Sequence, residues 1–181
     1  MKIAVIGTSE FTLNCAQILI DNECIVSALV SLPKNNLPNN SANVKKFSLL
    51  NNISYFETSD INSNKSISYL EELKVDFILS TWPHIILKRV IDIPKYGVIG
   101  THPTLLPRNR GRHPLHWMVS LGISNSKMSF FKMDETIDGG NILVQEPFIV
   151  GDNINSANHN MIEAGKNGLI NLIMALKENP S

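Results

Sequence analysis

Short apolar segments alternate with stretches of helical periodicity, and this alternation constrains the fold more than any other feature. We predict strands at 2–7, 25–30, 53–56, 75–80, 96–101, 128–133 and 142–150. We predict helices around 11–19, 44–50, 66–73, 115–121 and 155–176. Strands that alternate with helices form a mostly parallel sheet with helices on both faces. The sequence therefore predicts a doubly wound α/β fold.

The length and composition are typical of one globular domain. The chain has 181 residues, of which 43% are hydrophobic and 18% charged, and we expect residues 1–181 to form a single domain. Lysine plus arginine equal aspartate plus glutamate, at 16 each, so the net charge does not favour nucleic acid or a membrane as a partner. The net charge does not exclude a local basic patch. We therefore expect a small-molecule substrate.

The cysteines and the N-terminus indicate a cytoplasmic setting. Cys15 and Cys24 provide neither a disulfide framework nor a metal quartet, and Cys15 lies on an apolar helical face typical of a buried thiol. The first apolar run stops at Gly7, too early for a signal peptide. No segment approaches the roughly 18 apolar residues of a membrane span.

Three strand ends are candidate sites, because ligands of such sheets bind at the carboxyl ends of strands. The first turn has one glycine where a dinucleotide site needs three. It is either a tight turn with Ser9 as helix N-cap or a substrate site at a helix N-terminus, formed by Thr8, Ser9 and Glu10. The second site is at 81–86, where Trp82 is either a core aromatic or a wall of a substrate cleft. Residues 33–42, rich in Asn and Pro, form a loop that would suit a lid.

The third site contains His102, which follows a strand and precedes a proline-rich turn. This position suits a histidine held in a cleft, and a structural and a catalytic role are equally open. Asp134, Glu135 and Asp138 lie between two later strands. They are either a solvated acidic hairpin or the source of a carboxylate that orients the His102 imidazole.

These residues also carry a family resemblance. Residues 102–111 resemble the H-P-[ST]-L-L-P-x-x-R-G signature of folate-dependent formyltransferases, and 133–143 resemble their M-D-x-x-x-D-x-G-x-I-L loop. Residues 1–11 resemble the family's first strand and turn, and 61–77 the stretch before its next core strand. The match covers nearly the whole chain in the family's order.

The resemblance implies a Rossmann-type enzyme that uses 10-formyltetrahydrofolate and no metal. His102 would be the catalytic histidine and Asp138 the catalytic aspartate. A substrate amine would attack the formyl carbon, and the pair would stabilise the oxyanion and transfer a proton. The pterin ring would contact two segments: Ile85, Ile86 and Leu87, and Asp134, Glu135, Thr136 and Ile137. The alternative for the first segment is simple helix burial.

One position departs from the family pattern. The family usually has an asparagine two residues before the histidine, and this chain has Gly100. Loss of one oxyanion-hole donor typically costs roughly 10²–10³ in rate. Either another donor replaces it, such as Asn109, Asn141, Thr101 or a water, or the chain is slow or noncatalytic.

The loop after His102 carries several basic side chains. One of Arg108, Arg110 and Arg112 is expected to hold a substrate phosphate, and we assign Arg108, although solvated loop charges are the alternative. His113 and His116 are three residues apart and suit a helix surface or substrate contacts better than a metal site.

The acceptor is inferred by elimination among the family's branches. The tRNA-directed branch carries a further β domain and needs positive charge, and the glycinamide-ribonucleotide branch has a different first turn. This leaves an amino group on a nucleotide-linked sugar. The alternatives are a methionyl-tRNA formyltransferase-like protein lacking its C-terminal domain, a noncatalytic folate or nucleotide binder, and a fragment of a larger protein.

Overall fold

The fold is a seven-stranded sheet with strand order β3-β2-β1-β4-β5-β6-β7, flanked by helices. The computed structural model describes residues 1–39 and 41–180. The strands are β1 (Lys2–Gly7), β2 (Ile25–Ser31), β3 (Ser54–Glu57), β4 (Phe77–Thr81), β5 (Val98–His102), β6 (Asn125–Met133) and β7 (Gly140–Ile149). The helices are α1 (Glu10–Asp21), η1 (Lys34–Asn36), α2 (Val44–Leu50), α3 (Asn64–Leu73), α4 (Lys88–Ile91), α5 (Pro114–Ser120) and α6 (Ile154–Glu178).

The predicted mostly parallel sheet is confirmed. Strand β1 pairs in parallel with β2 and β4, β2 pairs in parallel with β3, and β6 pairs antiparallel with β7. Every predicted strand and helix is present, with ends shifted by a few residues. The short helices η1 and α4 were not predicted, because three or four residues carry no periodicity. Within the predicted loop at 33–42, Asn40 lies outside the described residues, as does Ser181 at the end of the chain.

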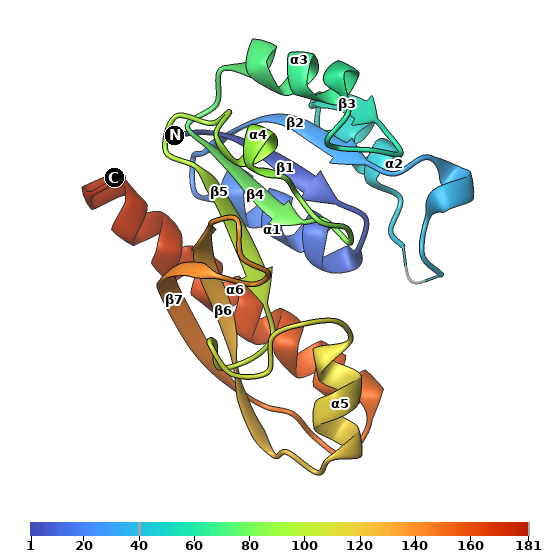
Figure 1. Cartoon of the computed structure of the whole chain (residues 1–181), viewed down its shortest axis with the longest axis vertical. Helices are drawn as coiled ribbons and strands as arrows, with labels where there is room; N and C mark the ends of the chain where they lie inside the picture. Colours follow the sequence, from blue (N-terminus) through green and yellow to red (C-terminus); the bar gives the residue numbers. More distant parts are fainter. Residues whose placement is uncertain (40, 181) are drawn as a thin grey trace. The chain divides into compact units, whose positions relative to one another are not determined.

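The chain divides into two compact units, Met1–Ile99 and Gly100–Asn179. In the first unit the chain runs outward from β1 to β3 and then returns to β4 beside β1. Right-handed crossovers then place α1 and α3 on opposite faces of the sheet, as Figure 1 shows. The reversal puts the carboxyl ends of β1 and β4 next to each other, which is the usual ligand position in such sheets.

The core of the first unit is built from the apolar parallel strands and the inner face of α1. Cys15 on that face is fully buried, and burial raises the pKa of its thiol. Both cysteines are free and buried, which confirms the predicted burial of Cys15.

The second unit packs α6 against the β6–β7 hairpin. The predicted inner face of α6 is confirmed, and its members are Ala157, Met161, Ala164, Leu172 and Leu176. Gly168 allows the close approach, because a Cβ there would lie 2.7 Å from the ring of Phe130. No helix in the described part of the chain is long and apolar enough to cross a membrane.

Candidate active site

His102 is the last residue of β5, and the turn that follows it is fixed by buried hydroxyl groups of β6. Its side chain is 7% exposed. The hydroxyl of Ser126 donates to the carbonyl of Pro103 at 3.1 Å, and that of Ser129 donates to the carbonyl of Thr104 at 2.6 Å. The backbone on which the imidazole stands is therefore held by its neighbouring strand.

Both nitrogens of His102 face oxygen atoms. Nδ1 lies 3.7 Å from Oδ1 of Asp138, and Nε2 lies 3.0 Å from the backbone oxygen of Asn109. Since a carbonyl oxygen only accepts, Nε2 carries the proton in this arrangement. The prediction that the two motifs meet is confirmed, and the acidic loop is more than a solvated hairpin. A small rearrangement from 3.7 Å would bring Nδ1 within hydrogen-bond distance of the carboxylate.

Asp138 is held by backbone geometry as well as by its partners. Its Oδ2 accepts from the backbone N–H of Gly111 at 2.8 Å, and its side chain is 23% exposed. Its φ of 48° is in the left-handed region, which Asp tolerates better than most residues. Gly140 follows with φ 108°, and a Cβ there would overlap the carbonyl oxygen of Lys132. The turn therefore requires glycine at this position.

The backbone groups of Asn109 and Gly111 were missed by the sequence analysis. They belong to one short segment that contacts both members of the pair. Asn109 has φ 57° and Gly111 has φ 106°. Any residue type supplies the same backbone atoms, so the sequence does not reveal these contacts. The glycine at 111 was the one residue type that indicated a close approach of the backbone to Asp138.

The space beside Gly100 is filled by apolar side chains. A Cβ at Gly100 would lie 2.6 Å from Cζ of Phe131 and 2.9 Å from Cγ of Met133. Phe131 is buried. The asparagine that the family resemblance leads us to expect therefore has no room here without repacking of β6.

The segment Ile85, Ile86 and Leu87 precedes α4 and is not helical. Ile86 is buried, whereas Ile85 and Leu87 are 66% and 50% exposed, so helix burial is wrong for these two. The side-chain amide of Asn62 fixes the segment: Nδ2 donates to the oxygen of Ile85 at 2.9 Å, and Oδ1 accepts from the N–H of Leu87 at 2.8 Å. Sequence analysis gave no role to Asn62.

The second predicted pterin segment, at 134–137, is exposed along its length. Thr136 donates to Oδ1 of Asp134 from both its hydroxyl and its backbone N–H. These two bonds, with a smaller contribution from Arg110, hold the pKa of Asp134 below its usual value. A loop that is closed on itself in this way presents Glu135 and Ile137 to solvent.

The remaining candidate residues are placed as follows. Ser9 is the N-cap of α1 in a capping box with Thr12, which confirms that prediction; Thr8 is buried and Glu10 exposed. Trp82 is 9% exposed, which favours the core-aromatic alternative.

Arg108 lies in the second unit and is exposed. His113 caps α5 with φ 57° rather than sharing a helical face with His116, and their ring centroids are 5.8 Å apart. Within residues 1–39 and 41–180, no group of three or more His, Cys, Asp or Glu is arranged to hold a metal ion.

A doubly wound sheet with a buried histidine–carboxylate pair at a strand end defines an α/β protein with a candidate acid–base site. The family can be given more narrowly, because the Formyl transferase family model matches residues 1–173. The chain belongs to the formyl transferase family.

Three known proteins illustrate the relationship. The chain is 31% identical over 156 residues to the methionyl-tRNA formyltransferase of Fusobacterium nucleatum, covering 84% of this chain and 50% of the relative. It superposes on a phosphoribosylglycinamide formyltransferase from Bacillus halodurans with TM-score 0.82 and 17% identity, covering 97% and 95% of the two chains. It superposes on a sugar 3N-formyl transferase, solved in the presence of dTDP and 5-N-formyl-THF, with TM-score 0.73 and 21% identity, covering 99% and 64%.

The chain spans about half the length of the curated relatives it matches.

Proposed function

We propose that the chain transfers a formyl group from 10-formyltetrahydrofolate to a primary amine, and that the amine is the amino group of methionyl-tRNA. The observation that carries the reaction class is the His102–Asp138 pair in a chain of the formyl transferase family. The acceptor is supported by the relatives named methionyl-tRNA formyltransferase, which share about a third of their aligned residues with this chain.

His102 and Asp138 are the proposed catalytic residues. The His102 imidazole is nearly buried and held between a carboxylate and a carbonyl oxygen, so its charged form has an acceptor on each side. A positive charge held in a site of low dielectric stabilises nearby developing negative charge strongly. The carboxylate of Asp138 would orient the ring and stabilise its charge as a proton leaves the attacking amine.

The co-substrate supplies the formyl group, and two exposed segments have a surface that suits it. Ile85 and Leu87 present apolar side chains from a backbone fixed by Asn62, and Ile137 does so from the self-bonded acidic loop. Exposed apolar side chains on rigid backbone suit a flat heteroaromatic ring. We propose each segment, taken by itself, as a contact surface for the pterin ring.

An amino group on a nucleotide-linked sugar is the second candidate acceptor. The elimination that favoured it rested partly on the balanced net charge, and relatives that are named for tRNA weaken that reasoning. Nucleic acid is therefore retained as a partner. The likeness to a sugar 3N-formyl transferase, at 21% identity, concerns the fold and keeps the sugar as an alternative.

Residues 1–181 are proposed to act as one catalytic domain, and a cytoplasmic setting remains a prediction from the sequence. Thr8, Ser9, Glu10 and Arg108 remain proposed substrate contacts.

An acceptor panel tests the proposal. The protein is mixed with 10-formyltetrahydrofolate and either methionyl-tRNA or nucleotide-linked amino sugars, and release of tetrahydrofolate is followed. We expect turnover with methionyl-tRNA. Turnover with an amino sugar but not with methionyl-tRNA would show that the sugar is the acceptor. Folate binding without turnover on any amine would favour the noncatalytic binder.

A further inference from the structure

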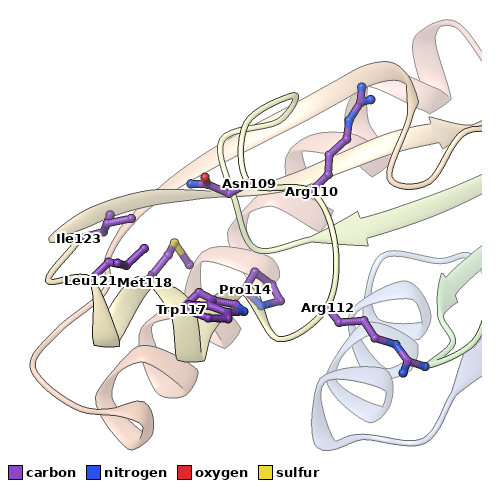
Figure 2. Close-up of a pocket in the computed structure, with 8 residues that line it drawn as sticks. All are labelled: Asn109, Arg110, Arg112, Pro114, Trp117, Met118, Leu121 and Ile123. Carbon is purple, nitrogen blue, oxygen red and sulfur yellow. The ribbon is translucent and has the colours of Figure 1, made fainter.

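A shallow pocket in the second unit lies beside α5 and has not been assigned a role (Figure 2). Its volume is about 190 Å³. The residues that line it are Asn109, Arg110, Arg112, Pro114, Trp117, Met118, Leu121 and Ile123. Figure 2 shows the apolar side chains gathered together, while Arg110 and Arg112 extend from the loop away from them and in different directions.

The apolar part of the pocket presents an indole ring to solvent. Trp117 lies on α5 and is 64% exposed. The next residue on the helix, Met118, is buried. An exposed indole ring beside a hollow provides a flat surface on which another aromatic ring can stack. Exposed apolar surface with a polar rim is typical of a binding site.

The chain segment that forms the pocket carries only positive formal charge. Between Val98 and Met133 the chain has five lysine or arginine residues and no aspartate or glutamate, although the whole chain has net charge zero. Within the described parts of the chain, Arg108 and Arg112 form no ion pair, and Arg110 interacts with the carboxylate of Asp134. Arginines without carboxylate partners are free to bind an anion, and phosphate fits their geometry.

The rim of the pocket also contacts the catalytic pair. Asn109 lines the pocket, and its backbone oxygen bonds Nε2 of His102. Gly111 stands between two lining arginines, and its N–H donates to Asp138. A molecule bound in the pocket would therefore lie beside the segment that holds the reacting groups.

We propose that this pocket binds the nucleotide part of the acceptor, with the base stacked on Trp117 and a phosphate held by Arg112. Both candidate acceptors carry this chemistry, as the 3′-terminal adenylate of a tRNA or as the nucleoside diphosphate of an activated sugar. The link to the acceptor rests on the proposed function, whereas nucleotide binding does not.

Fluorescence of Trp117 tests the proposal. The chain has two tryptophans, so Trp82→Phe leaves Trp117 as the sole reporter. AMP and UDP are titrated beside adenosine, uridine and inorganic phosphate. We expect saturable quenching by a nucleotide and binding of the matching nucleoside weaker by about tenfold or more, because the arginine–phosphate contact is lost. Tighter binding of AMP indicates the tRNA end, and tighter binding of UDP the activated sugar.

Two charge variants provide the matched comparison. Arg112→Ala should raise the nucleotide Kd by about tenfold. Lys45→Ala, which removes an exposed cation from the first unit, should leave it within about twofold. The indole N–H resonance of Trp117 in the unmodified protein provides a second readout if Trp82→Phe fails to fold.

Absence of any shift or quenching by AMP and UDP would overturn the inference, as would equal Kd values for nucleoside and nucleotide. Competition between AMP and 5-formyltetrahydrofolate would also overturn it, by assigning the pocket to the anionic tail of the folate. Nucleotide binding without formyl transfer would refute the proposed function and leave the assignment of the pocket intact. Formyl transfer with an unchanged acceptor KM in Trp117→Ala would refute the assignment of the pocket and leave the proposed function intact.

Discussion

Gly100→Asn introduces the amide that the family pattern leads us to expect, and the structure predicts that it harms the protein. The first added carbon would lie 2.6 Å from Cζ of Phe131 and 2.9 Å from Cγ of Met133, against about 3.5–4.0 Å for carbon atoms in favourable contact. Phe131 is buried, so its ring must shift within the core to admit the new side chain. Overpacking of this kind costs about 1–3 kcal/mol, and each kcal/mol lowers Tm by about 2–4 °C in a domain of this size.

Thermal unfolding followed by circular dichroism measures the loss, and the acceptor assay is run on the same samples. We expect a lower Tm and no gain in turnover. Gly100→Ala is the control for the clash of Cβ alone. Phe131→Leu makes room, so the double variant with Gly100→Asn should be more stable than the sum of the two single effects predicts, by about 0.5–3 kcal/mol. An unchanged Tm in Gly100→Asn, or a tenfold gain in turnover, would refute the steric reasoning.

Three further predictions follow from local geometry. Asn62→Ala should raise KM for 10-formyltetrahydrofolate about tenfold with kcat nearly unchanged, because the N–H of Leu87 loses its partner; amide hydrogen exchange at Leu87 should accelerate even if no turnover is found. Gly140→Ala should lower the free energy of unfolding by about 3 kcal/mol or more in urea titrations, because its positive φ and the Lys132 carbonyl leave no room for Cβ; a loss below 1 kcal/mol would count against this turn geometry. Burial raises the pKa of the Cys15 thiol, so it should react with Ellman's reagent only after unfolding, and rapid reaction of both thiols in the native protein would contradict that burial.

Much of the fold could be predicted because burial leaves a periodic trace in the sequence. The near-continuous apolar runs of β1 and β4 indicate parallel strands covered on both faces, and the inner face of α6 is visible at helical spacing. The division at Ile99 could not be predicted, because it falls inside β5, where no turn or linker marks a boundary.

The site was predictable only where it depends on side chains. His102 and Asp138 were visible from residue type and position, and the structure brings them together. The contributions of Asn109 and Gly111 come from backbone atoms, which any residue supplies. Gly100 was visible as a departure, but its cause depends on Phe131, thirty-one residues away on β6, and such a contact leaves no local pattern.

The most direct test of the account is formyl transfer by His102→Ala and Asp138→Asn beside the unmodified protein, with tetrahydrofolate release from 10-formyltetrahydrofolate and methionyl-tRNA as the readout. Tm is measured in parallel, and we expect it to stay within about 5 °C in each variant, which corresponds to a loss of about 1–2 kcal/mol. We expect turnover by the unmodified protein and a fall of about 10²–10⁴ in each variant, which is the range for loss of a positioned acid or base. Turnover that stays within tenfold in folded His102→Ala would contradict the central claim that this pair performs the transfer.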